Sequence, residues 1–344
     1  MKSIVTFLFI FLFLLASKVE AQKVKLESKP EENKVDVYIG NDLFTSYIYP
    51  KTIKKPVLWP VITAGGNEVT RQYPLKNKKG ERVDHPHHVG IWLNYGDVNG
   101  LDFWNNSEAI SEEKADNYGT IYHETIETVE SGRGKGFLVT SASWKNNDGE
   151  KLLNEISEYT FSADGDTRII DRTTYLKAVN GKVDITDNKE GMFAIRVTRE
   201  LELPATGKLK LVDSHGNVTE VDASNDNMAT GDYLSSEGIT GGDVWGTRAK
   251  WMKLFGEING EKVAVVIFDH PGNPGYPTYW HARGYGLFSA NTLGQKIFSE
   301  GKEEMNLSLD KNETVAFRYR LAVFSGNPSA AELDKMAKEF ESKI

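Results

Sequence analysis

The stretch Glu155-Ile156-Ser157-Glu158-Tyr159-Thr160-Phe161 alternates polar and apolar side chains. Successive side chains of a β-strand point to opposite faces of a sheet, so this pattern predicts a strand with one wet face and one core face. By contrast, Val263-Ala264-Val265-Val266-Ile267-Phe268 is apolar at every position. Such a run predicts a strand that is covered on both faces. The two stretches together indicate a protein built on sheets.

The same period near two recurs between turn residues along most of the chain. The expected strands are 34–39, 43–49, 57–62, 119–129, 136–145, 152–161, 167–178, 182–186, 192–198, 208–212, 262–268, 279–283, 286–290, 305–309 and 314–324. One helix is expected near the C-terminus, because Ser329 and Glu332 form a capping-box pattern before apolar residues at helical spacing. This inventory predicts an all-β fold, a single large antiparallel β-sandwich over residues 22–344 with one C-terminal helix.

Composition excludes several classes of protein. The chain has 344 residues, with 41 basic and 49 acidic side chains and a formal charge of -8. That balance argues against binding nucleic acid by bulk charge. Because the sequence has 0 cysteines, disulfides, thiolate catalysis, Fe–S clusters and cysteine-based zinc sites are excluded. The sequence gives no indication of the oligomeric state.

Residues 1–21 have the pattern of an export signal. Lys2 precedes a nearly unbroken apolar run over 4–16, and Val19-Glu20-Ala21 offers small residues for cleavage. The run is shorter than the roughly 20 residues that a membrane-spanning helix needs. No cysteine follows it, which excludes a lipoprotein anchor. The sequence therefore predicts a periplasmic or secreted protein without a membrane span.

Four long segments do not have the pattern of strands, namely 63–86, 97–118, 205–249 and 269–278. Long loops in compact domains are uncommon unless they are functional. The first runs into Asp84-His85-Pro86-His87-His88, which holds three of the seven histidines. In an extended conformation His85 and His87 would point to one side and His88 to the other, so the first two have the spacing of a strand-borne metal site.

Two further groups combine charge with apolar surroundings. Asp102 and Trp104 end the Gly96–Trp104 motif, where a tryptophan can either stack on a sugar ring or belong to the core. Lys189 and Glu190 precede an apolar strand, and Arg196 projects from a face of that strand that is otherwise apolar. A charge in such a place needs a partner or a ligand.

A fourth group follows the apolar stretch that ends at Phe268. Asp269 and His270 come directly after it, where a buried strand can present reactive side chains. On the next expected strand Tyr279, His281 and Arg283 share one face, which is poor core material and favours a ligand site.

These blocks also carry a resemblance. Their order and spacing resemble a bacterial family of unknown function that is often labelled methane oxygenase PmoA, over roughly 49–324. The blocks are 84–92, 96–104, 189–196, 269–270, 280–283 and 285–288. At fold level the strand inventory is similar to the galactose mutarotase-type supersandwich, which is used by aldose epimerases, polysaccharide lyases and glycoside hydrolases. That resemblance implies His, Arg and carboxylates on a concave sheet.

The leading hypothesis is an exported enzyme that acts on a sugar by general acid–base chemistry. Glu190 or Asp269 would be the base, and a protonated His88, His270 or His281 the acid. The residues expected to bind the sugar are Arg196, Arg283, Trp104, Trp280, Tyr279, Asp102 and Lys189. Epimerisation, hydrolysis and elimination stay open.

Two alternatives are a non-catalytic glycan-binding module and a metal-dependent enzyme. The leading hypothesis requires no cofactor, whereas the last alternative places a divalent metal on His85 and His87 with a distant Asp or His.

Overall fold

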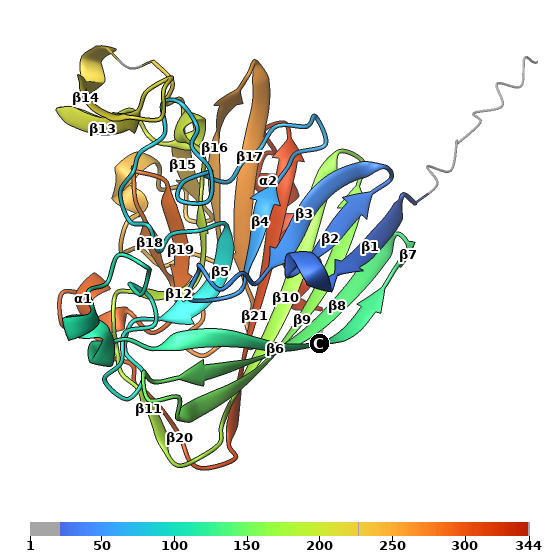
Figure 1. Cartoon of the computed structure of the whole chain (residues 1–344). Helices are drawn as coiled ribbons and strands as arrows, with labels where there is room; N and C mark the ends of the chain where they lie inside the picture. The colour runs from blue at the N-terminus through green and yellow to red at the C-terminus, as the bar shows by residue number, and fades with distance from the viewer. Residues whose placement is uncertain (1–20, 226, 343–344) are drawn as a thin grey trace, which may run out of the picture.

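Two large antiparallel sheets face each other in the computed structural model, which describes residues 21–225 and 227–342 (Figure 1). The nine-stranded sheet has the order β18-β19-β12-β5-β4-β3-β2-β1-β7, and the eight-stranded sheet has the order β15-β16-β17-β21-β10-β9-β8-β6. The expected signal peptide, except Ala21, lies outside the described residues. None of the described helices has the length and hydropathy that a bilayer crossing requires.

The elements are as follows. The nine-stranded sheet contains β1 (Lys23–Lys29), β2 (Lys34–Ile39), β3 (Asp42–Ile48), β4 (Val57–Val61), β5 (Ile91–Tyr95), β7 (Gly132–Arg133), β12 (Gly191–Arg196), β18 (Tyr279–Ala282) and β19 (Leu287–Asn291). The eight-stranded sheet contains β6 (Thr120–Glu130), β8 (Lys135–Lys145), β9 (Lys151–Asp164), β10 (Thr167–Ala178), β15 (Asp232–Ser235), β16 (Trp251–Ile258), β17 (Glu261–Asp269) and β21 (Thr314–Ser325). Two small sheets pair β11 (Val183–Ile185) with β20 (Leu307–Leu309) and β13 (Lys208–Val212) with β14 (Val218–Asp222). The helices are α1 (Gln295–Phe298), α2 (Ala330–Glu341) and short 3-10 turns at Pro30–Glu32, Glu112–Asn117, Arg199–Leu201, Ala223–Asn225 and Gly241–Val244.

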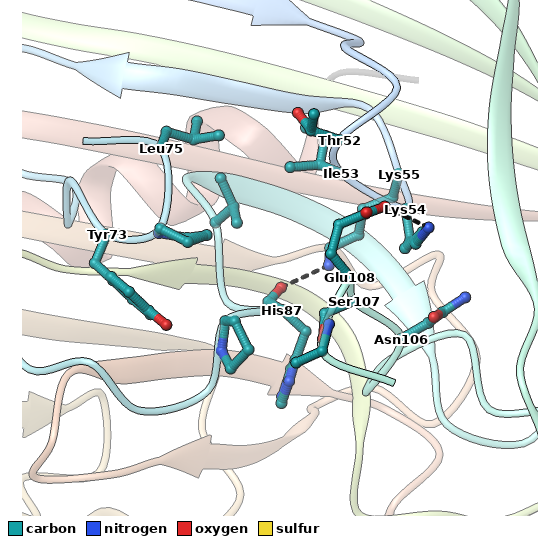
Figure 2. A pocket seen from close by; sticks show the side chains of 14 residues that line it. Thr52, Ile53, Lys54, Lys55, Tyr73, Leu75, His87, Asn106, Ser107 and Glu108 are labelled. Atoms are coloured by element: carbon teal, nitrogen blue, oxygen red, sulfur yellow. Dashed lines mark hydrogen bonds and ion pairs between the residues drawn. The ribbon is translucent and has the colours of Figure 1, made fainter. Parts of the chain in front are cut away.

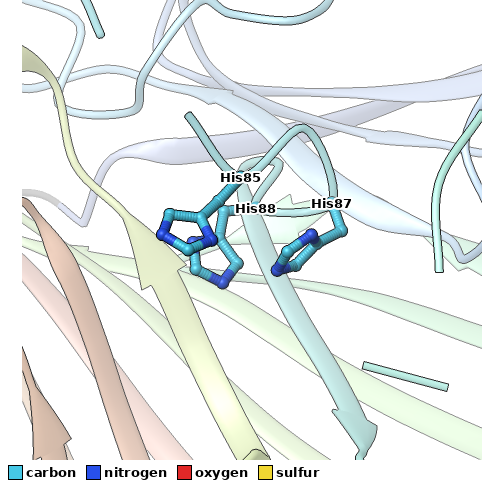
Figure 3. A group of neighbouring side chains, drawn as sticks. All are labelled: His85, His87 and His88. Atoms are coloured by element: carbon cyan, nitrogen blue, oxygen red, sulfur yellow. The ribbon is translucent and has the colours of Figure 1, made fainter. Parts of the chain in front are cut away.

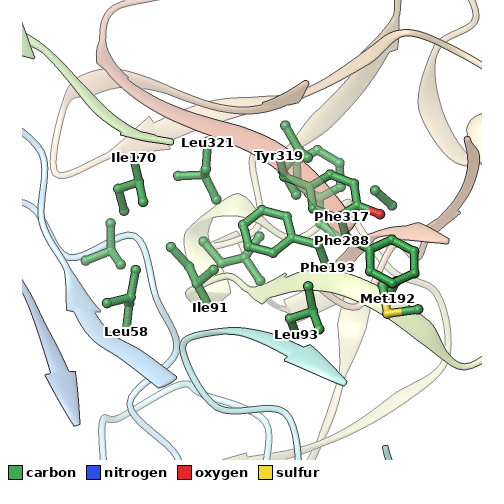
Figure 4. Packing of buried hydrophobic residues seen from close by; sticks show 14 of the residues in the cluster. Leu58, Ile91, Leu93, Ile170, Met192, Phe193, Phe288, Phe317, Tyr319 and Leu321 are labelled. Carbon is green, nitrogen blue, oxygen red and sulfur yellow. The ribbon is translucent and has the colours of Figure 1, made fainter. Parts of the chain in front are cut away.

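The main core lies between the two sheets. Phe193 of β12 and Tyr319 of β21 come from opposite sheets, and their rings stack with centroids 4.9 Å apart (Figure 4). Phe44 and Phe161 make a second contact between the sheets, edge to face at 6.4 Å. Burial of such rings is the main favourable contribution to folding of a chain that has no disulfide.

The apolar strand β17 is covered on both faces, as its sequence predicts. Val265 and Ile267 point into the main core, while Val266 and Phe268 lie under α2. The helix packs on the outer face of the eight-stranded sheet, and its buried Phe340 belongs to the same cluster. The all-β prediction with one C-terminal helix is confirmed, with α1 as an additional single turn.

Each of the fifteen expected strands overlaps an observed one, but several strands lack a clear period in the sequence. The most important for the site is β5, which lies between two of the expected loop segments. Those segments cover the outer face of the nine-stranded sheet, where Leu75 and Trp104 pack with Trp92 of β5 and Ala194 of β12. One sheet is thus covered by a helix and the other by long loops.

The capping box of α2 is present, since Ser329 Oγ accepts from the Glu332 N–H and Glu332 Oε2 accepts from the Ser329 N–H at 2.7 Å. We expect Ser329→Ala to lower the free energy of unfolding by about 1 kcal/mol, because one backbone donor loses its acceptor. Ser342→Ala at the other end of the helix is the control and should change it by less than about 0.5 kcal/mol. Chemical denaturation measures both; equal effects would contradict a stabilising cap.

Candidate functional site

A row of paired residues crosses four strands on the outer face of the nine-stranded sheet. His281 of β18 pairs with Ser289 of β19, Ser289 with Ala194 of β12, and Ala194 with Trp92 of β5. Directly paired residues of antiparallel strands point to the same face, so all four lie on the side away from the main core. With about 4.8 Å between neighbouring strands, His281 and Trp92 lie roughly 14 Å apart.

The histidine segment forms a turn over this face and is not extended, so the expected strand geometry is wrong. His85 has φ 43°, and the His88 N–H donates to the His85 carbonyl at 3.0 Å. The fully buried Arg71 holds the turn, donating to the carbonyls of Asp84, His85 and His88 at 2.8 to 3.0 Å. The turn therefore brings all three histidine rings together.

The rings of His85, His87 and His88 contact one another (Figure 3). His85 stacks on His88 with centroids 4.8 Å apart, and His87 meets His88 edge to face at 4.3 Å. Beneath them, His88 stacks on Trp92 at 5.3 Å and contacts Trp104 at 5.8 Å. Trp104 is fully buried, so it belongs to this packed cluster and offers no open stacking surface.

Arg196 joins the end of β12 to the histidine turn. Its side chain has an exposed fraction of 0%. Nη2 donates to Asp84 Oδ1 at 2.6 Å, and Nη1 lies 3.2 Å from His88 Nδ1. Because a guanidinium can only donate, Nδ1 of His88 accepts, and the proton of this neutral imidazole is on Nε2. Burial, followed by the charges of His87 and Arg196, holds the pKa of His88 well below its usual range.

Each of the three histidines offers one ligand atom, and these atoms lie within 4.8 Å of one another. Three protein ligands are enough for a metal site that keeps an open position. A ligating histidine normally donates its second ring N–H to a carboxylate or carbonyl. His88 instead accepts a hydrogen bond from Arg196 there, and a second guanidinium, Arg71, holds the same turn. On this tautomer His88 is not a metal ligand, which leaves His85 and His87 as the histidines of the expected metal site, and we assign no step to a metal.

Glu190 and His281 form the second part of the site. Glu190 Oε2 lies 3.6 Å from His281 Nδ1, and its Oε1 lies 3.0 Å from Lys189 Nζ. His281 is hydrogen-bonded to the backbone of Lys189, and its Nδ1 has no hydrogen-bond partner within the described residues, so Nε2 is the donating nitrogen. Burial, then the charges of Arg283 and Lys189, lowers the pKa of His281 to about 3. The lowered pKa values of His281 and His88 do not favour the expected role of a protonated histidine acid.

Tyr285 connects the two parts. Its ring stacks on His85 with centroids 5.2 Å apart and lies 4.9 Å from the guanidinium carbon of Arg196. The guanidinium of the exposed Arg283 lies 5.7 Å from the same ring. Burial raises the pKa of Tyr285; the charges of Arg196 and Arg283 oppose this shift, and the charge of Glu190 adds to it. The sequence analysis assigned Tyr285 no role, although it begins one of the motif blocks.

A cavity of about 540 Å³ opens beside the histidine turn (Figure 2). His87 and Lys55 line it, and Lys55 Nζ donates to the His87 carbonyl at 2.6 Å. Burial lowers the pKa of Lys55 to about 7. Neither Lys55 nor Arg71 was a candidate from the sequence, because both lie among ordinary loop residues without a motif.

One family profile matches residues 34–338, nearly the whole described chain. The chain belongs to the DUF6807 family, a family of unknown function. That description names no activity, so the label methane oxygenase PmoA finds no support in this match. No curated protein matches the sequence.

Several solved structures are similar to this DUF6807 protein. The galactosidase domain of the α-galactosidase-sucrose kinase AgaSK has a TM-score of 0.43 at 7% identity, covering 89% of this chain and 42% of that one. The GH36 α-galactosidase AgaA from Geobacillus stearothermophilus has a TM-score of 0.39 at 9% identity, and the match covers 83% of this chain and 40% of that one. A galactose mutarotase related enzyme from Lactobacillus acidophilus has a TM-score of 0.29 at 7% identity, and the match covers 89% of this chain and 99% of that one. The chain thus spans about two fifths of the length of the first two chains, and these likenesses assign no activity.

Asp269 and His270 lie apart from this site. Asp269 ends β17 in the other sheet and accepts hydrogen bonds from the backbone of His270 and Thr278 and from the Asn273 amide at 2.7 to 3.0 Å. These bonds shape the loop that follows the strand. The His270 ring meets Phe340 of α2 edge to face at 5.1 Å. The expected catalytic roles of Asp269 and His270 are therefore not supported.

Three other expected ligand residues are held by local contacts. Trp280 lies in the main core and donates from Nε1 to the Ala249 carbonyl at 3.0 Å, so it presents no stacking face. The Tyr279 hydroxyl donates to Glu303 at 3.2 Å. Asp102 accepts from the N–H groups of Trp104 and Asn105 at 2.9 Å. Of the expected substrate residues, only Arg196, Arg283 and Lys189 remain beside Glu190 and His281.

The tautomer of His88 can be tested by ¹⁵N NMR of the imidazole. We expect Nδ1 to show the shift of an unprotonated nitrogen and Nε2 that of a protonated one, unchanged between about pH 5 and 8 because the pKa of His88 is far lower. In Arg196→Met the preference for this tautomer should be lost. A protonated Nδ1 in the wild type would contradict the assignment and restore His88 as a metal ligand.

The role of Asp269 predicts a pH dependence of stability. Burial raises the pKa of its carboxyl to about 7, against about 3.9 in the unfolded chain. The protonated carboxyl therefore adds on the order of 4 kcal/mol to the free energy of unfolding below about pH 4. This contribution is lost as the pH rises to about 7. In urea titrations, Asp269→Asn should lose less stability across that interval than the wild type. Parallel pH profiles would mean that Asp269 is ionised throughout.

Proposed function

We propose that this protein is an exported carbohydrate-active enzyme that applies acid–base chemistry to a sugar at Glu190 and His281. The supporting observation is the meeting of three distant segments, 84–88, 189–196 and 281–285, on the outer face of one sheet. Titratable groups from separate segments that converge with shifted pKa values are typical of functional sites.

Hydrogen-bond acceptors gather at one end of this site. Glu190 is a carboxylate beside Lys189, and the free Nδ1 of neutral His281 is a second acceptor 3.6 Å away. Two acceptors cannot bond to each other, whereas a substrate hydroxyl between them could donate to either. In the proposed reaction His281 orients the hydroxyl and Glu190 takes its proton as general base.

Hydrogen-bond donors gather at the other end. Within the described residues, Arg196 Nε, His88 Nε2, Trp92 Nε1 and Trp104 Nε1 are buried nitrogen atoms without a hydrogen-bond partner. On the assigned tautomer each of them carries a proton. Such donors stabilise an oxygen that becomes negative during a reaction. They favour a ligand rich in oxygen atoms over a cation.

The arrangement favours epimerisation or elimination over hydrolysis. A glycosidase needs a second carboxyl group, about 5 to 9.5 Å from the first. Two carboxylates lie beside Arg196: Glu202, at 3.9 Å, is buried and already bonded to Arg82 and Arg199. Asp84 is bonded to Arg196, and although its burial would raise the pKa, Arg196 and Arg71 hold it below its usual value. Asp84 is therefore ionised and occupied by two arginines, and cannot serve as the acid.

Activity can be sought by NMR, following anomeric exchange and product formation across a panel of neutral and acidic sugars and glycosides. On any responsive substrate, Glu190→Gln and His281→Ala should each lower kcat/KM by about 10² to 10⁴, because each removes a group that handles the proton. Glu257→Gln is the control, because Glu257 is an exposed carboxylate on β16 of the other sheet. Unchanged turnover in both site variants refutes the proposal, and sugar binding without any product would instead favour a glycan-binding module.

A further inference from the structure

The cavity beside the histidine turn lies between four loop segments, 52–55, 73–75, 86–89 and 106–109 (Figure 2). Its walls combine apolar and polar groups. Ile53, Leu75, Val89 and Pro86 supply apolar surface, while Tyr73 supplies an aromatic ring. A volume of about 540 Å³ is within the usual range for small-molecule sites.

Lys55 is the unusual residue of this cavity. Its side chain is 4% exposed, and its Nζ donates to one neutral acceptor, the His87 carbonyl. Among the described residues Lys55 takes part in no ion pair. By contrast, the adjacent Lys54 pairs with Glu108 at 2.6 Å on the same wall, which leaves that carboxylate neutralised (Figure 2). A buried ammonium without a carboxylate is costly and is normally compensated.

The surrounding charges do not compensate Lys55. Asp102 attracts it through space, but that carboxylate already accepts bonds from the backbone of Trp104 and Asn105. On the inner side the ammonium lies 5.3 Å from the Trp92 ring centre. The ring face supplies a cation–π contact but no negative charge. Below about pH 7 the cavity therefore offers a cation that lacks a partner.

We propose that this cavity binds the carboxylate of an acidic sugar, with Lys55 as its counter-ion. The apolar and aromatic walls would contact the C–H faces of the ring. That the ligand is a sugar rests on the proposed function, whereas that it is an anion rests on Lys55 and the cavity alone.

Calorimetric titration with glucuronate, glucose, acetate and inorganic phosphate tests both parts. We expect the wild type to bind glucuronate at least tenfold more tightly than glucose or acetate. Lys55→Met should weaken glucuronate binding by about ten- to hundredfold, the value of one charge-assisted hydrogen bond, and leave glucose binding unchanged. Equal affinity of the wild type for glucuronate and glucose would overturn the proposal without any variant.

Lys253→Met is the matched control. Lys253 is also 4% exposed, but its Nζ donates to Asn327 Oδ1 and the Pro328 carbonyl near α2, far from the cavity. The Lys253→Met variant should bind glucuronate as the wild type does. Loss of binding in both variants would overturn the assignment to Lys55. If phosphate or acetate binds as tightly as glucuronate, the anion site stands and the sugar part is wrong. Because binding is measured without turnover, an inactive protein that still selects glucuronate would refute only the proposed function.

Discussion

A buried guanidinium holds the candidate site together. Arg196 ends a strand of the sandwich yet lies entirely out of water, bonded to Asp84 and beside the ring of His88. Removing one partner from a buried charge leaves the other uncompensated, at a cost of several kcal/mol. The histidine turn therefore cannot leave the sheet without taking the nearest carboxylate from this charge, which would leave Glu202 at 3.9 Å as its remaining partner. Arg71 adds to the constraint by binding three carbonyls of the same turn.

The two sheets use their outer faces differently. The eight-stranded sheet is closed by the apolar side of α2, which packs on Trp251 and Phe268. The nine-stranded sheet is covered by loops whose tryptophans, histidines and arginines mix packing with buried polarity. A helix satisfies its own backbone and needs only an apolar stripe. Loops bring more side-chain variety to a surface, and the candidate site lies on their side.

Alternation of side chains was enough to predict the sandwich, because strands such as β9 and β10 have one wet face. The capping box likewise located α2. The histidine turn was not predictable, since its conformation depends on Arg71, a residue without any local signal. Asp269 and Trp280 were misplaced for a different reason. Their motif is continuous in sequence, but β17 and β18 belong to different sheets, so the residues between them are divided between the core, a loop and the site. Lys55 became visible only through its burial.

The row from His281 to Trp92 has a consequence for how the protein can vary. Its four members sit on successive strands at matched positions, and in a pleated strand neighbouring residues face opposite ways. Deleting Ala194 from β12 would shift the residues that follow it by one position, turning Arg196 toward the core while Phe193 keeps its place. Insertions in the covering loops do not change which face of the sheet each strand residue points to. Diversity among related proteins should therefore accumulate as loop length, while strand length stays fixed.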